Sequence, residues 1–518
     1  MPTRAQLSDL LSSASREKLI WVLMGGLLIY TAIRGVVAAG AKSLWYDELL
    51  TLAIAVQPTM RGVWDAVSSA FDGQPFAFYL IERAALTLSL STEVALRLPS
   101  ILAMTCIVAC VFIHIKRRKG SWLAFLGATL FLSTGLFRSF VAEARPYGLM
   151  VACIALALIC YQRLPSALWA SLFGLFLALA QCLHYYAIFV TAAFGLAESV
   201  RLLKTRQFRW PIWIALAVSV VPLYLSRQVL LALKAFYAAH FWSNFGAADL
   251  PKTYGSLLLT STDYGIGVAA ICFAAVVGPY LWRFFVRSEA IWTEATADDL
   301  AEDALVLALL GLPFLVFAAA KVAHVGIVLR YVLPTVLGII LAVARIFSRA
   351  STKTTILFSI FVFAVVGISE LSFWRSVSWL PPQAPAVRVE EFVQGAGHPE
   401  LLVVVSDGLT YVQLAHYASP VWKQRFVYLA DQERVVQNLG TDSLEKGILA
   451  VRRYMPLEVR DFSEFVCSHQ VFLLYVEDPG SGFDWLPAYF VREAASLQVL
   501  SIEGNRKLYM VTLKPARR

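Results

Sequence analysis

Charged residues are scarce in this sequence. Asp, Glu, Lys and Arg make up 15% of the 518 residues, whereas about a quarter is usual in a soluble globular protein. Hydrophobic residues make up 59%, and the mean hydropathy is +0.67. This composition excludes an ordinary soluble enzyme and predicts an α-helical polytopic membrane protein.

Cysteine is also sparse, and its spacing excludes two kinds of site. The seven cysteines form no Cys-x-x-Cys pair and no metal-binding spacing, and only Cys467 lies in a polar segment. The sequence therefore implies neither a disulfide framework nor a metal cluster. Glycine-rich nucleotide loops, Asn-x-Ser/Thr acceptors and convincing internal repeats are absent too. The lack of repeats weighs against transporter folds built from two related halves.

Acidic residues are fewer than basic ones, giving a net charge of +9 and a pI of about 9.1. The basic residues cluster in short loops between apolar runs, which argues for membrane topology and against a nucleic-acid partner. The main clusters lie at 116–119, 201–209, 283–287 and 345–353. Since these loops fall on one face, we assign that face to the cytoplasm. The first seventeen residues are expected to be a retained cytoplasmic start, because no signal-peptide cleavage site follows them.

Apolar runs long enough to cross a bilayer number about eleven, since a span needs roughly twenty residues. The expected spans are 18–39, 92–115, 121–137, 146–162, 166–183, 185–200, 210–232, 264–283, 303–321, 331–347 and 354–373. Together they predict a membrane domain over residues 1–373. This topology places the loop 40–91 and the C-terminus on the outer face.

The two long outer loops are rich in aromatic residues. Within loop 40–91, helical periodicity over 56–70 and 76–90 predicts two helices lying along the membrane surface. The second loop, 233–263, is expected to be partly helical.

A Pro- and Trp-bearing segment, 374–385, separates the last span from a more polar region. Runs of β-type residues at 401–405, 426–429 and 471–476, and a hairpin of 497–502 with 507–513, alternate with helix-like stretches at 409–418, 443–451 and 457–467. Residues 374–518 are therefore expected to form a small extracytoplasmic α/β domain.

One acidic pair, Asp47 and Glu48, follows the first apolar run and is preceded by Trp45 and Tyr46. Adjacent carboxylates at a membrane surface are often only solvated loop charges. Here other polar residues fall at the ends of apolar runs on the same face, namely Arg97, Glu143, Arg145, His184 and Arg330. Their convergence favours a site on the outer face.

Two of these arginines each have two interpretations. Arg145 could pair with Glu143, or its guanidinium could bind a phosphate in a bidentate manner. Arg330 could be an interfacial anchor or a second phosphate ligand. His184 and Tyr185 could belong to an aromatic belt or to the site, and Gln74 lies in the turn between the two surface helices.

The order of six motifs resembles the bacterial GT-C glycosyltransferases related to protein O-mannosyltransferases and the lipid A aminoarabinose transferase. The motifs are WYDE, QPFAFYL, ALRLPS, EARPYGL, HYYAIF and RYVLP, and they extend over about the first 350 residues. The resemblance implies that Asp47, with Glu48 beside it, is catalytic, and that Arg145 and Arg330 face a donor phosphate. Where many relatives have His-Pro-Pro, this chain has Gln74, Pro75 and Phe76.

The resulting expectation is an inverting transferase of a bacterial inner membrane. It would move a sugar from a polyprenyl-phosphate carrier to a glycan, lipid or protein acceptor outside the cytoplasm, without a cofactor, although a divalent metal stays open. The substrate-binding residues would be Tyr46, Gln74, Arg97, Glu143, Tyr147, His184 and Tyr185. The alternatives are a lipid or solute transporter, and a polymerase or ligase that uses lipid-linked oligosaccharides.

Overall fold

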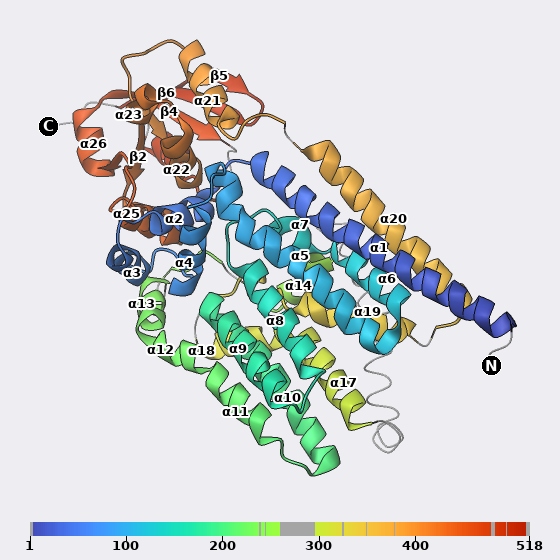
Figure 1. The fold of residues 1–518 in the computed structure, drawn as a ribbon. Coiled ribbons are helices and arrows are strands. Elements are labelled where there is room, and N and C mark those ends of the chain that lie inside the picture. The colour runs from blue at the N-terminus through green and yellow to red at the C-terminus, as the bar shows by residue number, and fades with distance from the viewer. Residues whose placement is uncertain are drawn as a thin grey trace.

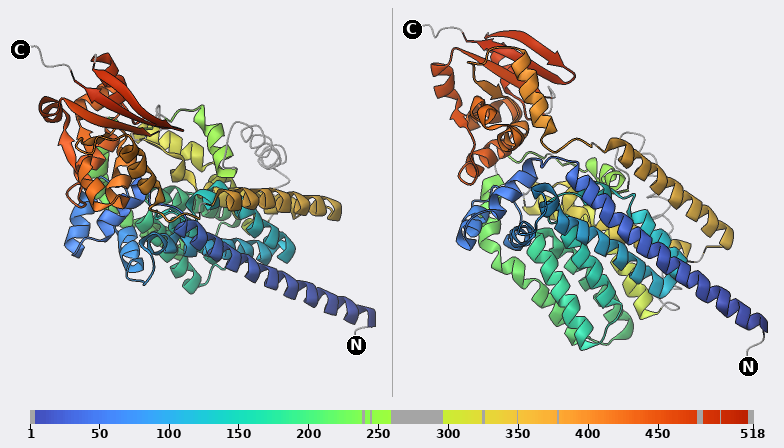
Figure 2. Two further views of the ribbon diagram at one scale, coloured as in Figure 1. Left: turned by 90° about the horizontal axis from the view of Figure 1, so that it is seen from above. Right: turned by 45° about the horizontal axis from the view of Figure 1, so that its top comes forward.

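A computed structural model describes residues 4–237, 240–243, 245–258, 296–323, 326–348, 350–377, 379–477, 482–493 and 495–513. Long helices form a slanted bundle, and a mixed sheet with its own helices lies at one end of it (Figure 1). The N-terminus lies at the opposite end of the bundle from the sheet, in all three views (Figures 1 and 2).

Every predicted span within the described residues is helical. The helices are α1 (Arg4–Gly40), α5 (Thr92–Lys119), α6 (Ser121–Phe131), α7 (Gly135–Phe140), α8 (Tyr147–Tyr161), α9 (Ala167–Leu183), the 3-10 helix η1 (Tyr185–Ala187), α10 (Ile188–Thr205), α11 (Trp210–Ser219), α12 (Val221–Leu225), α13 (Arg227–Tyr237), α17 (Ala297–Leu310), α18 (Leu312–Ala323), the 3-10 helix η2 (Leu329–Val332), α19 (Thr335–Phe347) and α20 (Thr352–Ser376). The predicted span 264–283 lies outside the described residues.

Four helical segments of the described chain are long and apolar enough to cross a membrane: Ser15–Gly40, Thr92–Lys119, Tyr185–Thr205 and Thr352–Ser376. The number rises to six if two helix pairs, each bent by 55°, count as one span each. One of these bends lies at Gly311, between α17 and α18. Helices α6, α8, α9 and α19 are apolar but shorter. The chain is thus a largely helical membrane-type fold, and the count of eleven stays a prediction.

The first and last long helices of the bundle lie side by side (Figure 1). Arg34 of α1 forms an ion pair with Glu370 of α20 at 2.6 Å, and its side chain is only 1% exposed. Tyr30 donates a second hydrogen bond to the same carboxylate, at 2.6 Å. A buried charge is tolerated when it is paired and hydrogen-bonded in this way. The contacts join α1 to α20, and Arg34 and Glu370 are 336 positions apart in the sequence.

Loop 40–91 contains three helices rather than the expected two. They are α2 (Tyr46–Ala55), α3 (Met60–Ser68) and α4 (Phe76–Ala85). The predictions of helices at 56–70 and 76–90 are confirmed with shorter bounds, while α2 was missed. Helix α3 starts later than predicted because Thr59 caps it, accepting a hydrogen bond from the amide of Gly62. The loop predicted at 233–263 contains α14 (Asp249–Leu258).

The C-terminal part contains a six-stranded sheet of order β3-β2-β1-β4-β6-β5. Its strands are β1 (Val403–Val405), β2 (Phe426–Ala430), β3 (Val459–Asp461), β4 (Val471–Glu477), β5 (Ser496–Glu503) and β6 (Arg506–Thr512). Strands β1 to β4 pair in parallel, and the predicted hairpin β5–β6 adds antiparallel strands beside β4. Strand β3 was not predicted; it occupies the start of the expected helix 457–467.

Helices cover both faces of this sheet. They are α21 (Ala384–Gly395), α22 (Gly408–Tyr417), α23 (Pro420–Arg425), α24 (Gln432–Leu439), α25 (Ser443–Val451), α26 (Phe462–Ser468) and α27 (Leu486–Arg492). Alternate residues of β1 and β2 point to opposite faces, as strand geometry requires. One face packs on α24, α26 and α27. The other packs on α21, α22 and α25, and its core is continuous with that of the helical bundle.

Candidate active site

A cavity of about 500 Å3 lies where the loop 40–91, the bundle and the C-terminal part meet. Residues from all three regions line it: Trp45, Tyr46, Asp47, Leu50, Phe71, Asp72, Gly73, Gln74, Arg145, His184, Tyr185, Tyr186, Leu230, Leu233, Lys234, Tyr237, Phe241, Trp242, Gly326, Arg330, Tyr331, Leu409, Ser443, Leu444 and Phe483. The size suits a small ligand, and the lining combines aromatic walls with a few charged groups, as in typical binding sites.

Asp47 lies in the first turn of α2, with its side chain 15% exposed at the cavity. One carboxylate oxygen, Oδ2, is 2.8 Å from Nη1 of Arg330 and 3.9 Å from Nη2 of Arg145. Arg330 comes from η2, in the sequence LRYV that precedes Pro334 and α19. The carboxylate of Asp47 therefore lies between two guanidinium groups.

Asp72 is a site residue that the sequence analysis missed. Its two carboxylate oxygens accept hydrogen bonds from Nη1 and Nη2 of Arg145, both at 2.8 Å, in a bidentate pair. Arg145 Nη1 also donates to the backbone oxygen of Asp47 and to Thr51 Oγ1, each at 3.2 Å. Arg145 thus pairs with Asp72 and not with its sequence neighbour Glu143. Its bonds to Asp47 and Thr51 hold the guanidinium against α2.

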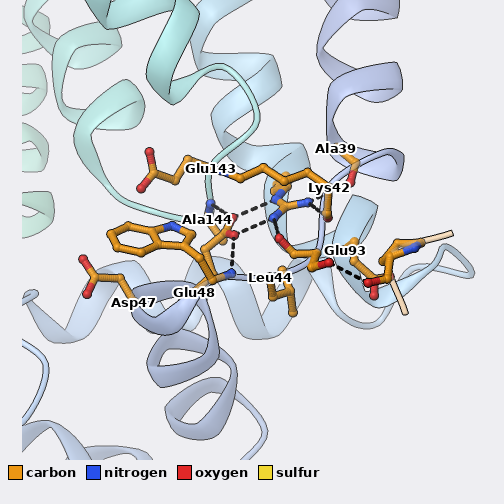
Figure 3. Close-up of polar contacts among 12 residues, drawn as sticks. Ala39, Lys42, Leu44, Asp47, Glu48, Glu93, Glu143 and Ala144 are labelled. Atoms are coloured by element: carbon orange, nitrogen blue, oxygen red, sulfur yellow. Dashed lines mark hydrogen bonds and ion pairs between the residues drawn. The ribbon is translucent and has the colours of Figure 1, made fainter. Parts of the chain in front are cut away.

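Glu48 lies next to Asp47 in sequence but outside the residues that line the cavity. Its carboxylate is fully buried and binds Arg97 of α5 through two hydrogen bonds, of 2.7 and 2.5 Å. Oε1 also accepts the amide of Ala144 at 2.8 Å, and Oε2 accepts the amide of Trp45 at 3.2 Å. In Figure 3 the carboxylate of Asp47 points away from this network. Adjacent helical residues are about 100° apart around the axis, which separates the two carboxylates.

Arg97 is also fully buried, and it binds the end of α1. Its Nη1 donates to the carbonyl oxygens of Ala39 and Lys42, at 2.7 and 2.6 Å, and its Nη2 donates to that of Ser43 at 2.9 Å. The carbonyl of Ala39 lies in the last turn of α1, where carbonyls lack helical partners, and those of Lys42 and Ser43 lie just after the helix. Together, Arg97 and Glu48 join the end of α1, the start of α2 and the turn that carries Arg145 (Figure 3).

The turn between α7 and α8 carries Glu143, Ala144 and Arg145. Ser100 of α5 donates to the backbone oxygen of Glu143 at 2.6 Å, which holds the turn against the bundle. Burial raises the pKa of the Glu143 carboxyl to about 7; the Glu48 and Asp47 carboxylates act in the same direction. Glu143 is thus a titrating group close to Asp47, although it is not part of the cavity lining.

His184 lies in the turn between α9 and η1, buried among aromatic rings. Tyr147, Tyr186 and Tyr331 all have ring centroids within 5.8 Å of its own. Burial, together with the nearby guanidiniums of Arg330 and Arg145, lowers the pKa of His184 to about 3. The imidazole is therefore neutral at physiological pH and does not add a third cation to the cavity.

Several buried polar atoms around the cavity have no hydrogen-bond partner among the described residues. They are Trp45 Nε1, Gln74 Oε1, Arg145 Nε, His184 Nδ1 and Arg330 Nε. Buried polar groups are nearly always paired in folded proteins, so a cluster of such atoms needs a specific explanation. Both arginines thus retain an N–H that their carboxylate partners do not use.

The C-terminal part holds the segment that leads to Asp47. Tyr417 Oη accepts the amide of Leu44 at 2.8 Å and donates to Glu93 at 3.0 Å, and Gln413 Nε2 donates to the carbonyl of Leu44 at 3.1 Å. On the same helix, α22, Leu409 lines the cavity. Gly447 of α25 lies against the hydroxyl of Tyr46, where a Cβ would collide with it.

The structure brings seven of the eleven predicted site residues to the cavity: Tyr46, Asp47, Gln74, Arg145, His184, Tyr185 and Arg330. Glu48, Arg97, Glu143 and Tyr147 lie behind this lining. The C-terminal residues Leu409, Ser443, Leu444 and Phe483 were not anticipated, because apolar contacts with a distant segment leave no local sequence pattern. No three His, Cys, Asp or Glu side chains of the described segments come together as metal ligands.

Comparison with known protein families gives no matching family model, and no curated protein sequence matches either. The fold is similar to that of ArnT from Cupriavidus metallidurans, the lipid A aminoarabinose transferase. The apo crystal structure gives a TM-score of 0.57 at 14% identity, over 95% of this chain and 97% of that chain. The structure of ArnT bound to undecaprenyl phosphate gives 0.55 at 13% identity, over 95% and 98%.

The oligosaccharyltransferase of Archaeoglobus fulgidus, crystallised with zinc and sulfate, is a more distant match. Its TM-score is 0.42 at 11% identity, over 87% of this chain and 68% of that chain. The likeness to ArnT confirms the resemblance seen in the sequence motifs and shows a GT-C-type fold. At these identities the likeness concerns the fold alone.

Proposed function

We propose that this protein is an inverting glycosyltransferase that moves a sugar from a polyprenyl-phosphate carrier to a hydroxyl-bearing acceptor. The observation that carries the proposal is the position of Asp47 in the cavity, between the guanidiniums of Arg145 and Arg330. A carboxylate can act as a general base, and paired guanidiniums suit a phosphate. The ArnT structure with undecaprenyl phosphate supports a lipid-linked donor for a protein of this fold.

The reaction is a single displacement at the anomeric carbon. The acceptor oxygen forms a bond to this carbon as the bond to the phosphate oxygen breaks, and the configuration inverts. Asp47 takes the proton of the acceptor hydroxyl, and the polyprenyl phosphate leaves with the bonding electron pair. Charge therefore disappears from Asp47 while it grows on the phosphate.

The ion pair of Asp47 and Arg330 links these two events. When Asp47 takes the proton, its carboxyl becomes neutral and no longer pairs strongly with the guanidinium at 2.8 Å. Arg330 is then free to stabilise the second negative charge of the leaving phosphate. Arg145 stays oriented by its bidentate bond to Asp72 and offers its unused Nε. Such preorganised charges stabilise a transition state without reorganisation.

The acceptor, glycan, lipid or protein, would approach Asp47 along the walls formed by the outer loops and the C-terminal helices. We place the cavity and the residues after 374 outside the cytoplasm of a bacterial cell, with the N-terminus inside. The basic loops at 116–119 and 345–353 support this orientation.

Purified protein in nanodiscs tests the function. It would be supplied with polyprenyl-phosphate sugars and with the glycan that loses a sugar in a deletion strain, and released polyprenyl phosphate would be measured. Asp47→Asn keeps the size of the side chain but removes the base, so turnover should fall by roughly 10²- to 10⁴-fold. Asp65→Asn is the matched control, because Asp65 lies in the same loop with its side chain 59% exposed. Wild-type turnover by Asp47→Asn would overturn the mechanism.

A further inference from the structure

A second hollow, which we call the basic groove, lies on the bundle away from the cavity. It has a volume of about 640 Å3 and is lined by Trp21, Ile113, Lys116, Arg117, Arg163 and Trp169. These residues come from α1, the last turns of α5, and the α8–α9 connection with the start of α9. The C-terminal sheet lies at the other end of the bundle (Figure 1).

Two of the cations in the basic groove rest on tryptophan rings. Lys116 Nζ is 4.3 Å from the ring centroid of Trp21, and the guanidinium carbon of Arg163 is 4.3 Å from that of Trp169. Trp21 is in turn held edge-to-face against Phe112, with centroids 5.1 Å apart. Cation–π contacts orient the charged groups without neutralising them.

The positive charge of the basic groove is only partly balanced. Lys116 pairs with Glu17 at 2.5 Å. Arg117 and Arg163 are exposed and form no ion pair with a carboxylate in the described part of the chain, and the lining contains no acidic residue. The groove therefore presents two free guanidiniums, the side chain best suited to grip an anionic oxygen group in a bidentate manner.

Apolar side chains next to the basic groove distinguish a lipid from a soluble anion. Ile113, on the lining itself, is 38% exposed, and Val22 and Leu168, the sequence neighbours of the two tryptophans, are 71% and 62% exposed. On a membrane protein such side chains contact acyl chains, while tryptophan and arginine occupy the headgroup level. The groove thus offers cationic groups and an apolar surface in one place.

We propose that the basic groove binds the headgroup of an anionic phospholipid from the leaflet around this end of the bundle. Arg117 and Arg163 grip the phosphate, the two tryptophans lie at the headgroup level, and the acyl chains extend along the exposed apolar residues. Clusters of basic residues at helix ends are suited to anionic lipids for this reason. The groove is separate from the proposed catalytic cavity, so this binding does not depend on the proposed reaction.

Native mass spectrometry of the purified protein tests the proposal. The protein would be reconstituted with equal amounts of phosphatidylglycerol and phosphatidylcholine, and the retained lipids would be counted. The wild type should retain phosphatidylglycerol preferentially. The double variant Arg117→Gln/Arg163→Gln should retain at least about five-fold less phosphatidylglycerol than the wild type. The control Arg61→Gln/Arg388→Gln removes the same charge from exposed positions outside the groove and should retain the lipid as the wild type does.

A charge-preserving variant and a soluble competitor make the result decisive. Arg117→Lys/Arg163→Lys should retain more phosphatidylglycerol than the Gln variant, because charge is kept and only the fork is lost. Equal retention by the Gln variant and the wild type would overturn the proposal. Displacement of the lipid by millimolar glycerol 3-phosphate would overturn the proposal in favour of a soluble anion. Equal retention of phosphatidylcholine and phosphatidylglycerol by the wild type would show that the charge of the lipid plays no role.

Discussion

Arg330 Nη1 lies 2.8 Å from Asp47 Oδ2, although the two residues are 283 positions apart in the sequence. The pair joins the start of α2 to the segment that precedes α19, so the second half of the bundle contributes directly to the surroundings of Asp47. In the proposed reaction, Asp47 becomes a proton acceptor only when acceptor and donor share this space.

The first prediction concerns Arg330. Arg330→Lys keeps a positive charge but loses the planar fork, whereas Arg330→Gln loses the charge as well. We expect turnover to fall about tenfold for Lys and at least about a hundredfold for Gln. Steady-state release of polyprenyl phosphate by purified variants measures both. If both variants turn over as the wild type does, Arg330 is only an interfacial anchor.

The second prediction separates Glu48 from Asp47. Glu48→Gln leaves the buried guanidinium of Arg97 without its counter-charge, and breaking a buried pair typically costs about 3–5 kcal/mol. We therefore expect Glu48→Gln to lower the melting temperature in detergent clearly, whereas Asp47→Asn should lower it little. A Glu48→Gln protein that melts as the wild type does, yet has lost turnover, would instead show a chemical role for Glu48.

The third prediction is a pH dependence that arises from Glu143. Its pKa is about 7 in the folded protein, mainly because of burial, against an ordinary value of 4.5. The folded state therefore holds the proton more tightly than the unfolded state does. The stability from this group is complete below about pH 4.5 and is lost as the pH rises to about 7.

The melting temperature of the wild type should thus fall more steeply between pH 5 and pH 7 than that of Glu143→Gln, which cannot ionise. Differential scanning fluorimetry of both proteins in one buffer series would show the difference. Parallel curves would mean that Glu143 is already ionised in the folded protein at pH 5.

The fourth prediction concerns the contact of α22 with the segment before Asp47. Tyr417→Phe removes the hydroxyl that accepts the Leu44 amide and donates to Glu93. We expect faster hydrogen exchange at Leu44 and a lower kcat, because Asp47 is displaced. KM should change little, because the residues that line the cavity are unchanged. Tyr454→Phe is the control, because its hydroxyl bonds Ser69, the residue after α3, away from Leu44. Unchanged exchange in Tyr417→Phe would contradict the positioning role.

The fifth prediction is the orientation of the chain. A reporter fused after Lys353 should be cytoplasmic, and one fused after Trp379 should be external, because the basic loops fix the orientation. The first fusion point lies in the first turn of α20 and the second follows the end of this helix. The same location for both reporters would remove the outer face on which the proposed site depends.

Sequence patterns predicted most of the secondary structure. Apolar runs marked the helices of the bundle, and the β-type runs at 401–405, 426–429 and 471–476 match β1, β2 and β4. Breaks inside apolar runs were missed, because both sides are equally hydrophobic; the turn at 132–134, where Thr134 caps α7, is one case. Strand β3 has only three residues, none of them buried, so its pattern was too short to detect.

The candidate site could be predicted only in part. Charges at the ends of apolar runs converge on one face, which is why Asp47, Arg145 and Arg330 could be grouped from sequence. Asp72 could not, because an Asp before Gly is typical of a turn and its partner Arg145 lies 73 residues away. Asp47 faces the cavity and Glu48 is buried because of the helical geometry of α2, and the sequence pattern predicted no helix at this position.

The bond between Leu44 and Tyr417 spans 373 residues, and this separation has a consequence for biogenesis. A ribosome completes α22 only after the bundle helices have been synthesised, so until then the backbone of Leu44 lacks its two partners, Tyr417 and Gln413. The wall formed by Leu409 and Leu444 arrives equally late. The cavity of a nascent chain therefore lacks its C-terminal wall until this part of the chain has been synthesised.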